Sequence, residues 1–181
     1  AHFHMYEGAP GYYKRSLDGF NKKIETNPLF TNIEVTGFHP TKALDIAPAG
    51  SADMVVTFRN LHNWYMGDGD TGVENSFKAF HKALKKGGIL GVVDHRMPEH
   101  LDQEENKRSG YMKQSYAIAM AEKVGFKLVA IIDINANAKD TAQHPRGVWT
   151  LPPRLALGEE DKEKYKAIGE SDRMTLKFIK E

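Results

Sequence analysis

The sequence contains no cysteine among its 181 residues, and this absence removes several kinds of chemistry. Disulfides, thiolate nucleophiles, cysteine-ligated zinc and iron–sulfur clusters are all excluded. Lys plus Arg number 25 and Asp plus Glu number 24, so the formal net charge is only +1. This balance predicts no binding to nucleic acid and none to an anionic membrane surface. No apolar run approaches the roughly 20 residues that cross a bilayer.

The composition is that of a folded globular chain, with 40% apolar and 27% charged residues. The length suits a single domain over residues 1–181, which is our expectation. The first residue is Ala1 rather than Met, which predicts a processed or incomplete N-terminus. The first residues also lack the pattern of a signal peptide. The compartment stays open: the cytoplasm is the default, and the periplasm applies where an export signal was removed.

Hydrophobic periodicity predicts alternating helices and strands. Apolar residues at helical spacing from Tyr13 to Ile24 predict an amphipathic helix. Residues 53–58 and 89–93 are compact apolar runs rich in β-branched side chains, which are typical of strands buried on both faces. The alternation of the two patterns predicts βαβ units, a mainly parallel sheet and helices on both of its faces.

Local signals place the other elements. Thr71 and Glu74 form a capping box, so a helix is expected to begin there and to end at Gly87 and Gly88. The remaining expected strands are 32–38, 127–134 and 174–179, and the remaining expected helices are 112–124 and 159–168. The last two strands are joined by about 40 residues with little helical pattern, which favours an antiparallel pair at the sheet edge.

Two predicted strand ends carry unusually many functional groups. Ligands of open α/β sheets bind beyond the carboxyl ends of the strands, and residues 58–64 and 93–96 occupy such positions. His62 and His95 are candidate general bases, and Asp94 could orient one of them. Each of these polar side chains could instead only cap a helix or bind a loop.

Further candidates for binding substrate lie in the same two segments and in the long connection near the end of the chain. Trp64 offers a flat face to a planar ligand, and Arg96, like Arg59, could hold a carboxylate or phosphate. Trp149 stands in a stiff apolar stretch that is either core packing or a pocket wall. Arg173 either binds substrate or pairs with Asp172 in a turn.

The N-terminal segment offers one candidate for metal binding. The His2 and His4 side chains have the residue type and spacing of metal ligands. No third ligand is identifiable, so no metal site is predicted.

Several segments, in order along the chain, resemble motifs of class I S-adenosylmethionine-dependent methyltransferases. Residues 49–58 resemble the family's fourth strand, residues 83–90 its "LKPGG" turn, and residues 121–126 its "aGF" motif. Residues 59–64, 93–96, 147–153 and 169–176 more narrowly resemble a bacterial group of methyltransferases with no assigned substrate. Together these motifs cover nearly the whole chain.

The resemblance implies a Rossmann-like fold with a seven-stranded sheet whose last strand is antiparallel. It also implies S-adenosylmethionine as cofactor, with Glu7, Asp45 and Asn60 as candidate ligands, although His4 occupies a place similar to that of Glu7. The family's first strand and its glycine-rich loop have no counterpart here, so this part of the domain is expected to be absent from the sequence. A chain without that strand is expected to self-associate through its unpaired neighbours.

Two functions follow as expectations. The first is methyl transfer to a small acceptor, with His62 or His95 as base and Asp94 as its support. The alternative is a non-catalytic ligand-binding or interaction protein on the same scaffold, which the lack of the glycine-rich loop favours. The acceptor and its reacting atom are not specified by the sequence.

Overall fold

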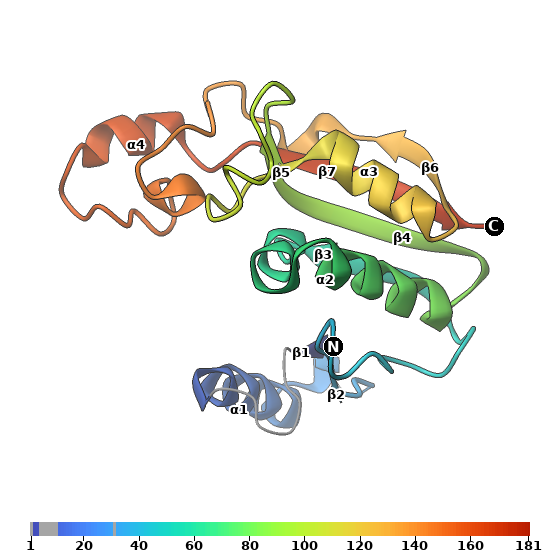
Figure 1. Ribbon diagram of the computed structural model, residues 1–181. Helices are drawn as coiled ribbons and strands as arrows, with labels where there is room; N and C mark the ends of the chain where they lie inside the picture. Colours follow the sequence, from blue (N-terminus) through green and yellow to red (C-terminus); the bar gives the residue numbers. More distant parts are fainter. Residues whose placement is uncertain (1, 4–10, 31) are drawn as a thin grey trace.

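The computed structural model describes residues 2–3, 11–30 and 32–181, and its centre is a mixed five-stranded sheet (Figure 1). The strand order is β3-β4-β7-β6, and β5 pairs with β4 beside this path. β4 runs parallel to β3 and β5, whereas β7 is antiparallel to both β4 and β6. The predicted α/β fold with an antiparallel last strand is therefore confirmed. The strands are β3 Ala52–Phe58, β4 Leu84–Met97, β5 Met112–Lys113, β6 Phe126–Ile131 and β7 Arg173–Lys180.

The register of β3 and β4 decides where the polar segments meet. Phe58, the last residue of β3, pairs with Val93, so β4 continues past the end of β3 at the same edge of the sheet and places Asp94 and His95 there. β4 is 14 residues long and includes Gly87 and Gly88, which were expected to end the preceding helix. The backbone N–H of Arg59 donates to the carbonyl of Val93 (2.7 Å), which continues the ladder past the end of β3.

The helix between these strands begins earlier than the sequence signals predict. α2 spans Leu61–Ala83, and Gly69, with φ 59° and ψ −146°, interrupts it. The capping box at Thr71 therefore lies just past this interruption rather than at the start of the helix. The stretch before Thr71, which the capping box would leave outside the helix, is helical because Leu61 and Tyr65, one turn apart, are both buried in the core.

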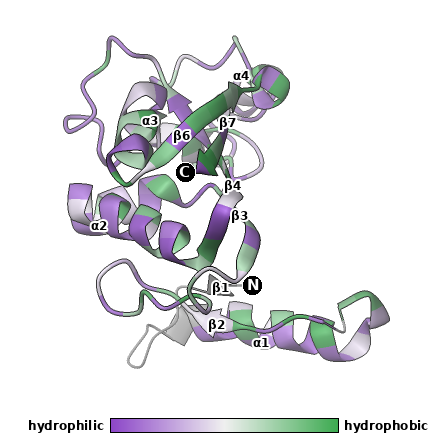
Figure 2. Cartoon of the chain, turned by 90° about the vertical axis from the view of Figure 1, so that its right-hand side faces the viewer, coloured by the Kyte–Doolittle hydropathy of each residue, from purple (hydrophilic) through white to green (hydrophobic). Residues whose placement is uncertain are grey.

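One face of the sheet is covered and the other is open. α2 and α3 (Gln114–Lys123) lie on the same side of the strands (Figure 2), and Val92 and Phe178 are completely buried beneath them. On the opposite face Met54, Val56 and Phe58 are each more than half exposed. The prediction that β3 is buried on both faces is therefore wrong, because no helix among the described residues covers the second face.

The N-terminal elements lie apart from the main sheet, below α2 in Figure 1. α1 spans Gly11–Thr26, as its periodicity predicts, and a 3-10 turn follows at Pro28–Phe30. β1 (His2–Phe3) pairs in parallel with β2 (Thr36–Gly37) in a separate two-stranded sheet. The described strands thus form sheets of five and two rather than the seven-stranded sheet that the resemblance implies, and the strand expected at 32–38 shortens to β2.

The connection between β6 and β7 is long and mostly irregular. It contains 3-10 turns at Asp133–Asn135 and Gly147–Thr150, and α4 at Lys162–Ile168. Because β7 enters the sheet between β4 and β6, the predicted antiparallel pair of final strands is confirmed. None of the helices in the described part of the chain has the length and apolar character needed to span a membrane.

Candidate active site at the carboxyl ends of β3 and β4

A buried histidine–carboxylate pair joins the two strand ends. The Nδ1 atom of His62, in the first turn of α2, lies 2.8 Å from Oδ1 of Asp94 on β4. The backbone N–H of His62 also donates to Oδ2 of Asp94 (3.0 Å). Asp94 is 0% and His62 is 4% exposed. The carboxylate therefore orients the imidazole and satisfies one of the free N–H groups at the start of α2.

His95 lies beside this pair. Its ring centroid is 5.2 Å from that of His62, and its backbone N–H donates to Oδ1 of Asp94 (2.7 Å). Its Nδ1 atom is 2.5 Å from the Oγ atom of Ser171, which precedes β7. Among the described residues, the Nε2 atoms of both histidines have no hydrogen-bond partner. Each of these atoms can therefore receive a proton or bind a ligand.

The protonation of the cluster follows from burial and from the neighbouring charges. Burial lowers the pKa of His95 to about 4, and the nearby positive charges of Arg173 and Arg59 add to this effect against the attraction of Asp94. Burial would raise the pKa of Asp94, but the interactions with His62 outweigh it and hold that pKa below its usual value. At neutral pH the cluster thus contains an ionised carboxylate and a neutral His95.

The same three side chains offer ligand atoms within 4.8 Å of one another, as a metal site would. Both oxygens of Asp94 already accept hydrogen bonds from N–H groups of His62 and His95. The arrangement therefore fits an acid–base cluster better than a metal centre.

Two aromatic side chains border the histidines. Trp149 packs its ring edge-on against His62 at 6.1 Å between centroids, so it forms a wall of the site as well as part of the connection between β6 and β7. Tyr111 packs against His95 at the same distance and donates its hydroxyl to Asp140 (2.9 Å). Burial, followed by the charge of Asp140, raises the pKa of the Tyr111 hydroxyl.

The two candidate arginines differ in their contacts. Arg96 forms two hydrogen bonds to the carboxylate of Asp172, at 2.8 and 2.9 Å, so its guanidinium is already neutralised. Arg173 pairs with Glu170, and its Nε atom is buried with no partner. The Asp172–Arg173 pair considered from the sequence is therefore wrong, because Asp172 turns to Arg96 instead. Arg173 is the Cα partner of His95 across β4 and β7, which keeps it a candidate for binding substrate.

Two other predicted residues lie away from the cluster. Trp64 is 3% exposed and packs against Phe38 and Phe80 in the hydrophobic core, so it presents no open face to a ligand beside His62. Asp45 forms an exposed ion pair with Lys82 (2.5 Å) near the opposite, amino end of the β3–β4 pair. Asp45 thus lies away from the cluster, and Trp64 lies in the core and along the cleft beside β3 rather than beside His62. Glu7 and His4 lie outside the described residues.

A cleft of about 420 Å³ beside β3 is the place where the cofactor could be held. Its walls include Phe38, Ile46 and Trp64, and Asn60 lies at the end of β3 on the same cleft. The apolar walls fit a flat adenine ring, and the Asn60 amide fits a polar group of the cofactor. The described residues that line the cleft include no carboxylate for the ribose hydroxyls.

Sequence reasoning missed the two residues that contact His95 and the carboxylate that accepts a hydrogen bond from one of them. Ser171, Tyr111 and Asp140 come from three separate segments and carry no spacing motif. The carboxylate of Asp140 also accepts from His144 (2.8 Å) and from the backbone N–H of Asp172 (2.8 Å). Only the return of the long connection towards β4 brings these groups together.

Comparison with known proteins supports the fold and no finer assignment. No protein-family model matches the sequence, and no curated protein matches it. The cyclase SpnF, which performs a [4+2] cyclisation, aligns with a TM-score of 0.57 at 13% identity over 88% of this chain and 60% of its own. A S-adenosylmethionine-dependent methyltransferase from Methanosarcina mazei aligns with a TM-score of 0.55 at 10% identity over 88% of this chain and 74% of its own.

A third solved structure contains the product form of the cofactor. The O-methyltransferase NcsB1, in complex with S-adenosyl-L-homocysteine, aligns with a TM-score of 0.53 at 15% identity over 91% of this chain and 39% of its own. The chain thus spans from 39% to 74% of the length of these three proteins. It has the fold of class I S-adenosylmethionine-dependent methyltransferases, a fold that also serves a cyclase.

Proposed function

We propose that this protein transfers a methyl group from S-adenosylmethionine to a small acceptor, with His62 as the general base. The observation that carries the proposal is the buried Asp94–His62 pair, whose Nε2 atom is free at the carboxyl ends of two adjacent parallel strands. This is the position where ligands of open α/β sheets bind. The motif order at residues 59–64 and 93–96 supports the narrower membership in the bacterial methyltransferase group.

The proposed chemistry is a proton transfer coupled to nucleophilic attack. S-adenosylmethionine, when bound, supplies a methyl group on a positively charged sulfur that leaves as a neutral thioether. His62 Nε2 accepts the proton of the acceptor as the acceptor's lone pair forms the new bond to carbon. Asp94 holds the ring in orientation and stabilises the imidazolium that results. Such a transfer depends mainly on positioning, because the nucleophile and the methyl carbon must approach almost in line.

Three further residues complete the proposed site. Asn60 holds the cofactor at the end of β3, and Trp149 forms a wall beside the acceptor. His95 is neutral at pH 7, since burial lowers its pKa to about 4, and its Nε2 atom can accept a hydrogen bond from the acceptor.

The decisive experiment measures cofactor binding and turnover separately. Calorimetry with S-adenosylmethionine tests binding, and release of S-adenosylhomocysteine with a panel of phenols, amines and thiols tests transfer. His62→Gln and Asp94→Asn should lower turnover by about 10²- to 10⁴-fold, as loss of a general base does. Asp53→Asn, which removes an exposed carboxylate at the amino end of β3, is the matched control and should leave turnover unchanged.

Each outcome distinguishes methyl transfer from ligand binding without catalysis, or tests His62 as the base. No binding at millimolar S-adenosylmethionine would reject methyl transfer and leave the ligand-binding alternative. Binding and turnover that survive His62→Gln would keep the methyltransferase and reject His62 as its base.

A further inference from the structure

Two adjoining cavities share Trp149, whose ring packs against His62, as a lining residue. The first, of about 720 Å³, is lined by Arg146, Trp149 and Arg154 together with residues 155, 156 and 158. The second, of about 520 Å³, also includes Arg146 and Trp149, and it adds Arg108 and Glu105. Because they share two lining residues, we treat them as one hollow and call it the arginine hollow. It borders the proposed base through a single indole ring.

The arginine hollow has an excess of positive charge. Its described lining residues include three arginines, Arg108, Arg146 and Arg154, but only one carboxylate, that of Glu105. None of the three guanidinium groups is paired with a carboxylate within the part of the chain that the structure describes. By contrast, Arg96 and Arg173 are both paired. The hollow therefore presents free planar donors, which suit the oxygens of a carboxylate or a phosphate.

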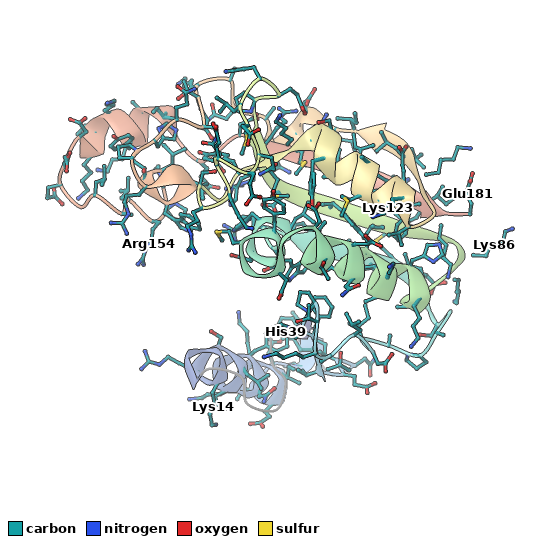
Figure 3. The ribbon with its side chains drawn as sticks, in the orientation of Figure 1. Lys14, His39, Lys86, Lys123, Arg154 and Glu181 are labelled. Carbon is teal, nitrogen blue, oxygen red and sulfur yellow. The ribbon has the colours of Figure 1, made fainter. Side chains whose placement is uncertain are left out.

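The geometry also sets the direction of a bound molecule. Arg154 lies on the connection between β6 and β7 and extends from its ribbon (Figure 3), and Arg146 stands three residues before Trp149. Arg146 and Arg154 line the same cavity as Trp149, and the Trp149 ring also contacts His62, so an anionic group held by the arginines leaves the rest of a bound molecule beside the indole. A flat molecule can lie along that indole and direct its other end towards the base.

We infer that the arginine hollow binds the acceptor, and that the acceptor is a planar molecule carrying an anionic oxygen group, with Arg146 and Arg154 as the residues that recognise the anion. That the bound molecule is the methyl acceptor rests on the proposed function, but its binding to the hollow requires no turnover. Carboxylates and phosphates share the chemistry that the guanidinium groups recognise, so the test includes one of each.

The test measures binding to the full chain without S-adenosylmethionine. The probes are 4-hydroxybenzoate, phenyl phosphate and the neutral 4-hydroxybenzamide. Their binding is measured by calorimetry and by tryptophan fluorescence. At least one anion should bind about tenfold more tightly than the amide, as expected for charge-assisted hydrogen bonds. The tighter of the two anions identifies the preferred group. Trp149→Phe should abolish the fluorescence response, since Trp64 is buried in the core.

Variants then assign the binding to the hollow. Arg146→Gln and Arg154→Gln should each weaken the preferred anion by about tenfold, because each removes a charged donor. Arg15→Gln, which removes the same charge from an exposed position on α1, is the matched control and should change affinity by less than about twofold. Equal loss in the Arg15 control would overturn the inference by showing a general charge effect.

The remaining outcomes are equally informative. Equal affinity for the amide and the anions, or no anion binding at millimolar concentration, would overturn the inference with the unaltered chain alone. If the chain binds the anion but does not bind S-adenosylmethionine, the result would support the arginine hollow as an anion site and reject methyl transfer. His62→Gln should lower turnover by about 10²- to 10⁴-fold but leave anion binding intact, which keeps the two proposals separable.

Discussion

Each end of the β3–β4 pair carries an acidic side chain paired with a basic one, at similar distances but in opposite surroundings. At the carboxyl end, His62 and Asp94 are 2.8 Å apart, with side chains 5% and 0% exposed. At the amino end, Lys85 and Asp53 are 2.6 Å apart, with side chains 50% and 84% exposed. Water screens the exposed pair, so such pairs typically contribute about 0–1 kcal/mol, whereas breaking a buried pair costs about 3–5 kcal/mol. Burial rather than distance therefore separates the candidate site from the solvent-exposed end.

The strongest test of this difference is Asp94→Asn. The amide offers one acceptor oxygen in place of two and leaves buried N–H groups of His62 and His95 poorly satisfied, so the free energy of unfolding should fall by about 3 kcal/mol. Urea denaturation measures the change. Asp53→Asn is the control at the exposed end, and its midpoint should match that of the parent chain. Equal loss in both variants would show that the two ends do not differ as we describe.

The second prediction uses pH to titrate His95 at the buried end. Below pH 6.5 the unfolded chain takes up a proton at His95, whereas the folded chain does not until about pH 4. The free energy of unfolding should therefore fall by roughly 3 kcal/mol as the pH decreases across this window, and it should fall further below it, because the pKa of Asp94 is also lower in the folded chain than in the unfolded one. Stability curves at several pH values measure it. His95→Asn should flatten the profile, whereas His100→Asn, at an exposed position, should not.

The third prediction concerns the intermediate case, the half-buried pair of Arg96 and Asp172. Asp172 accepts two guanidinium hydrogen bonds and also the backbone N–H of Asn137 (2.8 Å). Asp172→Asn should cost about 2 kcal/mol in unfolding free energy and expose the connection between β6 and β7 to proteolysis. Asp133→Asn is the comparison, because its contact with Arg96 is longer (3.3 Å) and Asp133 is 74% exposed. A larger effect for Asp133 would reverse our ranking.

The smallest expected effect lies at the exposed end. Asp45→Asn removes the carboxylate that pairs with Lys82, at a side chain that is 84% exposed. Both the urea midpoint and the affinity for S-adenosylmethionine should stay within error of the parent, because solvent already screens this charge. Calorimetry gives the affinity. A marked loss of cofactor binding would restore Asp45 to the cofactor site from which its position removes it.

Much of the fold was predictable because hydrophobic periodicity is a local property. The helix from Tyr13 to Ile24, the strands β3 and β4 and the antiparallel pair of β6 and β7 all follow from the order of apolar residues. The early start of α2 was not predictable from capping signals, because the burial of Leu61 and Tyr65 outweighs the polar composition of that stretch. The open face of β3 was missed because a run of apolar residues does not reveal what covers it.

The residues of the candidate site were likewise predictable only in part. His62, Asp94 and His95 could be named because they follow predicted strands, and parallel pairing brings such ends together. Trp64 shares a segment with His62, yet two residues along a helix turn it to another side, into the core. The arginines of the hollow and the supporting Asp140 carry no pattern at all.

The sequence by itself determined the type of each main element and the two polar strand ends, since those depend on neighbours within a few residues. Tertiary structure alone decided the partners: Asp94 for His62, Ser171 for His95, Arg96 for Asp172 and Trp149 beside His62. These contacts join residues that lie between 32 and 87 positions apart in the chain. Only the pairing of the strands and the return of the long connection set the distances and the burial that make these groups a site.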